Sequence, residues 1–152
     1  AELTVWLNEL VRKLQGLRTP NPADAVPAVM ARSMVARPAL CRLLILLHTV
    51  IEPKIDAVSA LDFKLFLRDL LTRASAEIAN QLPGMRTEQA QTLVLQMHAL
   101  VISIAQLSNP PPVIAQVMAD NPELQVMRID FESFLRSTLA TLVRGSLVQP
   151  VS

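Results

Sequence analysis

Apolar residues recur at helical spacing along nearly the whole chain, and the alternation of apolar and β-branched residues that marks strands is almost absent. Prolines and Gly84 separate the periodic segments, as expected where helices begin and end. We therefore predict an all-α protein, an antiparallel helical bundle of about six to seven helices. The predicted helices cover residues 1–17, 24–37, 38–52, 56–82, 87–108, 113–119 and 130–147.

The stretch from Pro38 to Pro53 is the most apolar of these segments. Between the two prolines only Arg42, His48, Thr49 and Glu52 are appreciably polar. The segment is too short to cross a bilayer, which takes about 20 apolar residues. A helix that is apolar on nearly all sides must be covered by other helices. We expect it to be the central helix, ending near Glu52 because a proline follows.

The neighbouring helices supply further expectations. The second helix is expected to start near Pro22 or Asp24, and Asp24 is the preferred N-cap because Pro27 would then lie in its first turn. In the segment 56–82, Asp69 and Arg73 have the spacing of an ion pair. The buried stripe of that segment is predicted to comprise Phe63, Phe66, Leu67, Leu70, Leu71, Ala74, Ile78 and Leu82.

The two last long helices each carry a second face suited to burial. No residue from Gln89 to Asn109 is formally charged, apart from a possible charge on His98. The glutamine, histidine and serine side chains of this segment argue against a membrane span. The segment 130–147 has a stripe of small side chains that another helix could approach closely, and Leu147 to Pro150 is expected to fray. Two buried faces are more than a peripheral helix of a monomer needs.

Composition supports an additional buried surface. Apolar residues make up 51% of the chain and charged residues only 18%, which suggests an oligomer interface. The net charge of +1 includes no run of Lys or Arg, so we expect no DNA-binding surface here. The single cysteine, Cys41, cannot form an internal disulfide, and a reduced cytoplasmic setting is expected.

Catalytic chemistry is not indicated. The sequence has no nucleophile elbow, no glycine-rich phosphate loop and no paired carboxylates in apolar context, so we expect no enzyme and no cofactor. His48 and His98 lack partners at metal-ligand spacing, so no metal is expected. His48 is either a core histidine or a polar group in a pocket. Cys41 is either a small buried side chain or, with Arg37 and Arg42 beside it, a redox-sensitive thiol.

The order of several segments resembles a known family. These are A-R-S-M-V-A-R-P-A-L-C-R-L-L-I-L-L-H-T-V-I-E at Ala31 to Glu52, D-F-K at Asp62, L-P-G-M at Leu82, Q-M-H-A-L at Gln96, and N-P-P-P at Asn109. Together they resemble the C-terminal domain of TetR-family transcriptional regulators, over essentially the whole chain. Each is a loose helical pattern, so their order carries the resemblance.

The resemblance implies a domain that pairs into a homodimer through a four-helix bundle and holds a small apolar or amphipathic effector. We map the bundle to residues 87–108 and 130–147. The predicted interface residues are Leu95, His98, Ile102, Ser133, Ser137, Thr138 and Thr141. The predicted ligand-binding residues are Met30, Met34, Cys41, Leu44, His48, Phe63, Phe66 and Met97.

The helix-turn-helix domain of such regulators is not in this sequence. We interpret residues 1–17 as the end of a helix that leads from that missing N-terminal domain, and 18–152 as the ligand-binding and dimerisation domain. The whole regulator, expected to be a repressor, would contact DNA only through the missing domain. The domain described by this sequence would control that DNA binding. The alternative is a free-standing helical interaction module without ligand. An upstream reading frame that encodes three short helices, one of them basic, would exclude that alternative.

Overall fold

The computed structural model describes residues 2–148, and over that range it contains helices and turns but no strand. The predicted all-α class is therefore confirmed. The α-helices are α1 (Glu2–Gln15), α2 (Pro22–Val35), α3 (Pro38–Leu46), α4 (Ala57–Gln81), α5 (Thr87–Ser108), α6 (Pro112–Asp120) and α7 (Phe131–Val148). Three short helical turns, η1 (Leu47–Ile51), η2 (Glu52–Lys54) and η3 (Pro122–Met127), complete the order.

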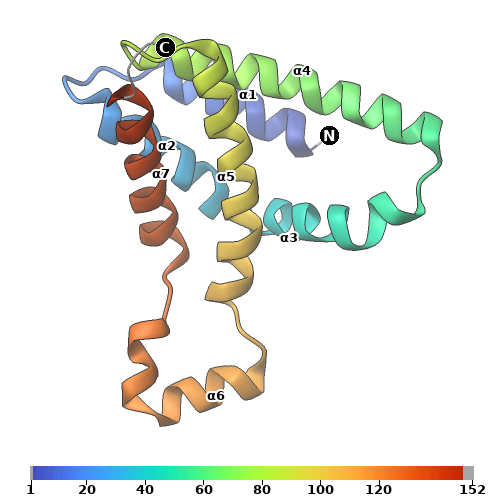
Figure 1. Ribbon diagram of the computed structural model, residues 1–152, viewed down its shortest axis with the longest axis vertical. Helices are drawn as coiled ribbons and strands as arrows, with labels where there is room; N and C mark the ends of the chain where they lie inside the picture. The colour runs from blue at the N-terminus through green and yellow to red at the C-terminus, as the bar shows by residue number, and fades with distance from the viewer. Residues whose placement is uncertain (1, 149–152) are drawn as a thin grey trace.

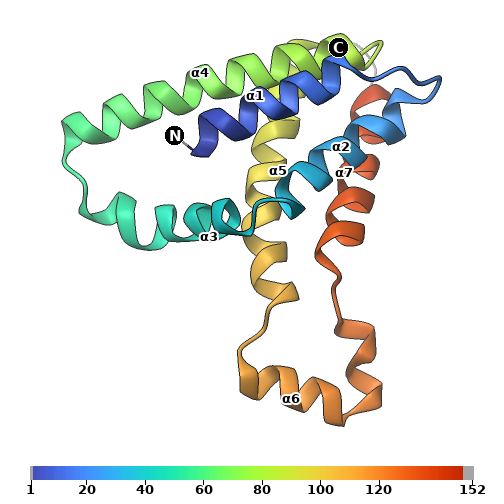
Figure 2. The ribbon, with the colours of Figure 1, turned by 180° about the vertical axis from the view of Figure 1, so that it is seen from behind.

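The helices form two groups that cross, α1 with α4 and α5 with α7 and α2 (Figures 1 and 2). α1 lies along α4, and the two run in the same direction, because Asn8 contacts Arg73 and Gln15 contacts Glu77. α5 and α7 descend from this pair as antiparallel neighbours, with α2 packed against α7. α6 and η3 connect the far ends of α5 and α7 and lie away from the core.

The core is located where the two groups meet. Leu7, Leu10 and Leu14 of α1 are fully buried, so the first helix belongs to the same core as the rest of the described chain. Leu135 and Leu139 of α7 are equally inaccessible. Between α4 and α5, Gly84 has φ +87°, a conformation that glycine adopts without the strain of a Cβ.

The Pro38–Pro53 segment is not the central helix that its composition suggested. α3 ends at Leu46 and continues as the π-helical turn η1, and the exposed fractions of Leu46 and Val50 are 48% and 42%. Only one side of the segment, which includes Leu40 and Leu44, is buried. The segment lies at the edge of the fold, where α2 and α5 cover a single face (Figure 1).

The prediction that Asp24 caps the second helix is wrong by three residues. α2 has Asn21 as its N-cap, with Pro22 in the first turn, and Pro27 is a buried residue inside the helix. The Asn21 amide donates to the Asp24 carboxylate over 2.6 Å, and that carboxylate also pairs with Arg144 of α7. The Asp24 side chain therefore joins two helices instead of capping one.

The predicted buried stripe of α4 is correct only in its second half. Leu70, Ala74 and Ile78 are buried, but no residue before Leu70 is buried in this helix. Phe66 is 36% exposed and its ring packs beside that of Phe63, with centroids 6.4 Å apart. The first half of α4 extends beyond α1 and α5, which leaves it with no helix to cover that face (Figure 2).

Two smaller expectations also need correction. Asp69 pairs with Arg68, whereas Arg73 donates to the Asn8 side chain of α1, so the predicted Asp69–Arg73 pair does not form. Leu147 and Val148, expected to fray, are the last residues of α7. Gln149 and Pro150 lie outside the described residues, as does Ala1.

We predict that Leu10→Ala lowers the free energy of unfolding by about 2–5 kcal/mol, because it leaves a cavity in a fully buried site. Urea unfolding at fixed protein concentration measures this change. Val5→Ala, on the same helix but 47% exposed, is the control and should change stability by less than about 0.5 kcal/mol. Equal losses in the two variants would contradict the assignment of α1 to the core.

Candidate functional site

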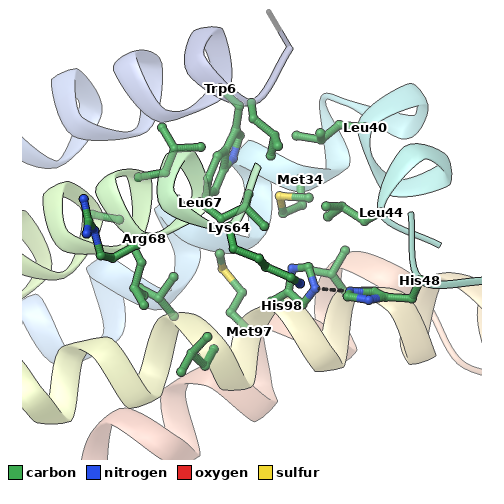
Figure 3. A pocket seen from close by; sticks show the side chains of 17 residues that line it. Trp6, Met34, Leu40, Leu44, His48, Lys64, Leu67, Arg68, Met97 and His98 are labelled. Atoms are coloured by element: carbon green, nitrogen blue, oxygen red, sulfur yellow. Dashed lines mark hydrogen bonds between the residues drawn. The ribbon is translucent and has the colours of Figure 1, made fainter. Parts of the chain in front are cut away.

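A cavity of about 420 Å³ lies where α1, α3, α4 and α5 meet (Figure 3). This volume is within the range of about 300–1,000 Å³ that small-molecule sites occupy. Most of the wall is apolar, and its polar side chains come from α4, α5 and the turn η1. The lining residues are Leu3, Trp6, Met34, Leu40, Leu44, His48, Lys64, Leu67, Arg68, Leu70, Leu71, Ala74, Val94, Leu95, Met97, His98 and Val101.

The position of Trp6 in the wall is set by a buried hydrogen bond. Its indole N–H donates to Ser33 Oγ over 3.0 Å, and the Ser33 hydroxyl donates to the Met30 carbonyl over 2.7 Å. Both polar groups are thereby satisfied away from water, as buried polar groups generally are. The ring of Trp6 can therefore present its apolar surface to the cavity without leaving an unpaired N–H.

Two histidines from distant segments meet at one end of the cavity (Figure 3). His48 Nε2 lies 2.8 Å from His98 Nε2, and the rings are nearly perpendicular, with centroids 5.1 Å apart. His48 belongs to the π turn η1, a kind of irregularity that often occurs at functional sites. His98 is in the middle of α5, so this contact joins the edge segment to a core helix.

The pair continues into a chain of polar contacts. His48 Nδ1 lies 2.9 Å from Glu52 Oε2, and the other oxygen of Glu52 accepts from Lys64 Nζ over 2.5 Å. The hydrogen bonds from Lys64 and then His48 lower the pKa of Glu52, so this carboxylate is ionised at neutral pH. Burial, followed by the charges of His48 and Lys64, lowers the pKa of His98. His98 is therefore neutral at pH 7.

These contacts determine where the protons lie. An ionised Glu52 can only accept, so His48 Nδ1 carries a hydrogen and donates to it. Since the two Nε2 atoms face each other, the bond between them holds one hydrogen. When both rings are neutral, His98 Nε2 must be the donor and His98 Nδ1 is left as an acceptor. The pair can therefore accept one further proton, on His98 Nδ1, without losing its mutual bond.

Four of the eight predicted ligand-binding residues line the cavity: Met34, Leu44, His48 and Met97. Met30 is fully buried behind the wall, with its carbonyl bonded to Ser33. Phe63 and Phe66 lie outside the lining. For His48, the structure favours a pocket position over a packed core, because its side chain is 39% exposed.

Cys41 also lies outside the lining. Its thiol donates to the Met34 carbonyl over 3.6 Å, and burial raises its pKa. This direction is opposite to the lowering that the neighbouring arginines suggested in the sequence. A thiol that is buried and protonated behaves as a small apolar side chain and reacts slowly.

Sequence reasoning missed several residues of the wall. Leu3 and Trp6 had been treated as part of a linking helix, while Lys64 and Arg68 had no assignment at all. Lys64 lies in the segment D-F-K and Arg68 follows one turn later, so helical spacing could have placed them on one face of α4. Nothing in the sequence could place that face opposite the histidines.

The predicted interface residues are divided between the surface and the cavity. Ser133, Ser137 and Thr141 of α7 are exposed, and Thr138 is half-buried. On α5, Leu95 is 57% exposed but also lines the cavity, as does His98. Ile102 is half-buried against the core.

The described residues also bear on a metal site and on a membrane span. Within residues 2–148, no group of three or more His, Cys, Asp or Glu side chains is placed to hold a metal ion. α5 has the length and hydropathy of a membrane span, with a mean of 1.4 over eighteen residues. Core helices share these properties, and Leu93, Met97, Val101 and Ile104 of α5 are buried in the protein core.

Comparison with known protein families finds a match over most of the chain. The family model described as the tetracyclin repressor-like C-terminal domain matches residues 1–150. No curated protein matches the sequence. The match covers every described helix, including all segments that form the cavity.

We predict that His98 makes stability depend on pH. Because its pKa is lowered in the folded chain, the unfolded chain binds more protons between that pKa and about 6.5, and the free energy of unfolding falls as the pH is lowered through this window. Urea unfolding should show a larger loss between about pH 7.5 and about pH 5.5, a range that includes the upper part of that window, in wild type than in His98→Gln. Glu52 has a lowered pKa and loses its contribution only in more acidic solution. Equal losses in the two proteins would contradict the burial of His98.

Proposed function

The chain belongs to the family of tetracyclin repressor-like C-terminal domains, and from that premise we propose that it senses a small-molecule effector and pairs into a homodimer. The observation that carries the proposal is the cavity of about 420 Å³, apolar over most of its wall and polar at one end. Sites for small molecules commonly combine a mostly apolar wall with a few polar groups that fix orientation. The Trp6, Met34 and Met97 side chains would contact the apolar part of the effector.

The mechanism would be differential affinity. The cavity wall includes Leu3 and Trp6 of α1, Lys64 and Leu67 of α4, and Met97 of α5, so an effector would touch three helices at once. It can shift their arrangement only as far as it binds one arrangement better than another. A shift of α1 would be passed to a preceding DNA-binding domain, and a shift of α5 to the partner subunit.

The homodimer would form through α5 and α7. α7 keeps its stripe of Ser133, Ser137 and Thr141 exposed, and Phe134 beside it is 45% exposed. Small side chains let helices approach closely, and an aromatic side chain supplies apolar area. A two-fold axis would bring the same stripe of the partner against it, so each substitution acts twice.

The proposal extends to the complete regulator, its DNA-binding domain and its place in the cell. We propose that the complete protein is a repressor in which an N-terminal helix-turn-helix domain, absent from this sequence, contacts DNA. Residues 1–17 would lead from that domain into the cavity wall, because Leu3 and Trp6 lie on both the connecting helix and the lining. We assign the protein to the cytoplasm, where its free cysteine would stay reduced.

The pocket can be tested with a neutral fluorescent probe, N-phenyl-1-naphthylamine. Trp6 is the only tryptophan and lines the cavity, so bound probe should accept energy from it and quench its emission in a saturable titration. Val94→Phe, which adds bulk to the wall, should weaken binding about tenfold or more, since each 1.4 kcal/mol of lost contact is tenfold. Val35→Phe, outside the lining, is the control. Unchanged binding to Val94→Phe would place the probe elsewhere.

The dimer can be tested by size-exclusion chromatography with light scattering. Wild type should have twice the chain mass, and Ser137→Arg or Thr138→Arg should be monomeric, because each would bury an unpaired charge at the proposed interface. Thr72→Arg, at an exposed position of α4, is the matched control and should stay dimeric. Circular dichroism should show unchanged helix content in all variants. A wild-type monomer at micromolar concentration would contradict the proposed interface.

A further inference from the structure

The polar part of the cavity wall consists entirely of nitrogen-bearing side chains. Among the 17 lining residues, the polar ones are His48, Lys64, Arg68 and His98, without a carboxylate or hydroxyl. The N–H of Trp6 is already bonded to Ser33. The wall therefore offers an occupant hydrogen-bond donors and positive charge at one end, and apolar surface elsewhere.

We propose that the effector is an amphipathic carboxylic acid whose carboxylate lies between Lys64 and the His48–His98 pair, with its apolar body against Trp6, Met34 and Met97. This inference rests on the proposed effector-sensing function and names the chemical class of the ligand.

Lys64 is the main cation available to such a carboxylate. Its ammonium carries three donors, and the structure shows one of them bonded to Glu52. Arg68 donates through Nε and Nη2 to its neighbour Asp69, which neutralises part of its charge. Since Glu52 is also bonded to His48, an incoming carboxylate would share the Lys64 ammonium with it and add negative charge beside the imidazoles.

That added charge would favour a proton on the histidine pair. With both rings neutral, His98 donates to His48 and presents a bare Nδ1. When His98 gains a proton on Nδ1, it keeps its hydrogen on Nε2 and still donates it to His48. The pair then carries one positive charge and a new donor, both of which suit a carboxylate. The charged groups around it are Glu52 of η2 and Lys64 and Arg68 of α4.

Binding of the acid would therefore take up a proton on His98, whose pKa is lowered by burial in the free chain, and affinity would rise as the pH falls below neutral. Protonation of both rings would place two N–H groups against each other and break the contact, which limits the uptake to one proton. An uncharged ligand of the same shape would show neither effect.

The apolar portion accounts for the rest of the affinity. Apart from the four polar residues, the other 13 of the 17 lining residues have apolar side chains. Each methylene that is buried against them should improve affinity about fourfold, until the cavity is filled. The chain length at which this gain stops would measure the usable depth.

The test is isothermal titration of the chain with unbranched carboxylates from hexanoate to dodecanoate, below their micelle concentrations. Primary alcohols and primary amines of equal length are titrated in parallel. Each acid should bind about tenfold or more tightly than the matched alcohol, as expected for a charge-assisted hydrogen bond, and amines should bind most weakly. Titrations in buffers of different ionisation enthalpy should show proton uptake with the acids alone.

Variants identify the residues responsible. Lys64→Met and His98→Leu should reduce the advantage of acid over alcohol to nearly onefold while the alcohols still bind, and Lys13→Met, exposed on α1, should keep the full advantage. Alcohols that bind as well as acids, or an advantage that survives in both pocket variants, would overturn the inference and leave the proposed pocket standing. If the neutral naphthylamine binds but none of the carboxylates does, the inference is likewise overturned and the proposed pocket stands. If neither the carboxylates nor the naphthylamine bind, the proposed pocket itself is overturned.

Discussion

The arrangement depends on one helix that can be buried on more than one side. α5 packs against α3, α4 and α7, and from Gln89 to Ser108 it has no Asp, Glu, Lys or Arg. A formal charge buried on one of its packed faces without a partner would destabilise the fold by several kcal/mol, on the order of the free energy lost when the charge leaves water. Because there is none, α5 supplies the core with Leu93 and the cavity with Met97.

The cavity exists because α1, α3 and α4 cross α5 instead of lying along it as α7 does. α1 and α4 run side by side over one end, and α2 and the segment Pro38–Lys54 meet at a bend of 81°. Side chains as large as Leu and Met fill a parallel bundle, but where helices diverge they leave a space between them. The contacts from His48 to His98 and Glu52, and from Glu52 to Lys64, join the turns η1 and η2 to α4 and α5 at one end of this space.

The high apolar content of the chain is found partly at the surface. α6 and η3 have no buried residue among those described, and Val113 and Val126 are 74% and 89% exposed. The first half of α4 is similar, with Val58 72% exposed. The composition is therefore explained by surface as much as by core.

The sequence by itself determined the helices. The 3.6-residue period, together with Pro83-Gly84 and Pro110 to Pro112, placed α5 at its observed bounds and α7 within one residue of them, because backbone preference and amphipathic pattern are local properties. Of the eight residues that it predicted to bind ligand, four line the cavity: Met34, Leu44, His48 and Met97.

Only the tertiary structure decided which apolar face has a neighbour. Pro38–Pro53 reads as a central helix, yet the crossing of α2 and α5 covers one side of it and leaves Leu46 and Val50 exposed. The pairing of His48 with His98, fifty residues apart, depends on that same crossing. Periodicity records what a helix can bury and carries no information on the angle at which another helix meets it, so the polar end of the cavity, with Lys64 and Trp6, became visible only in three dimensions.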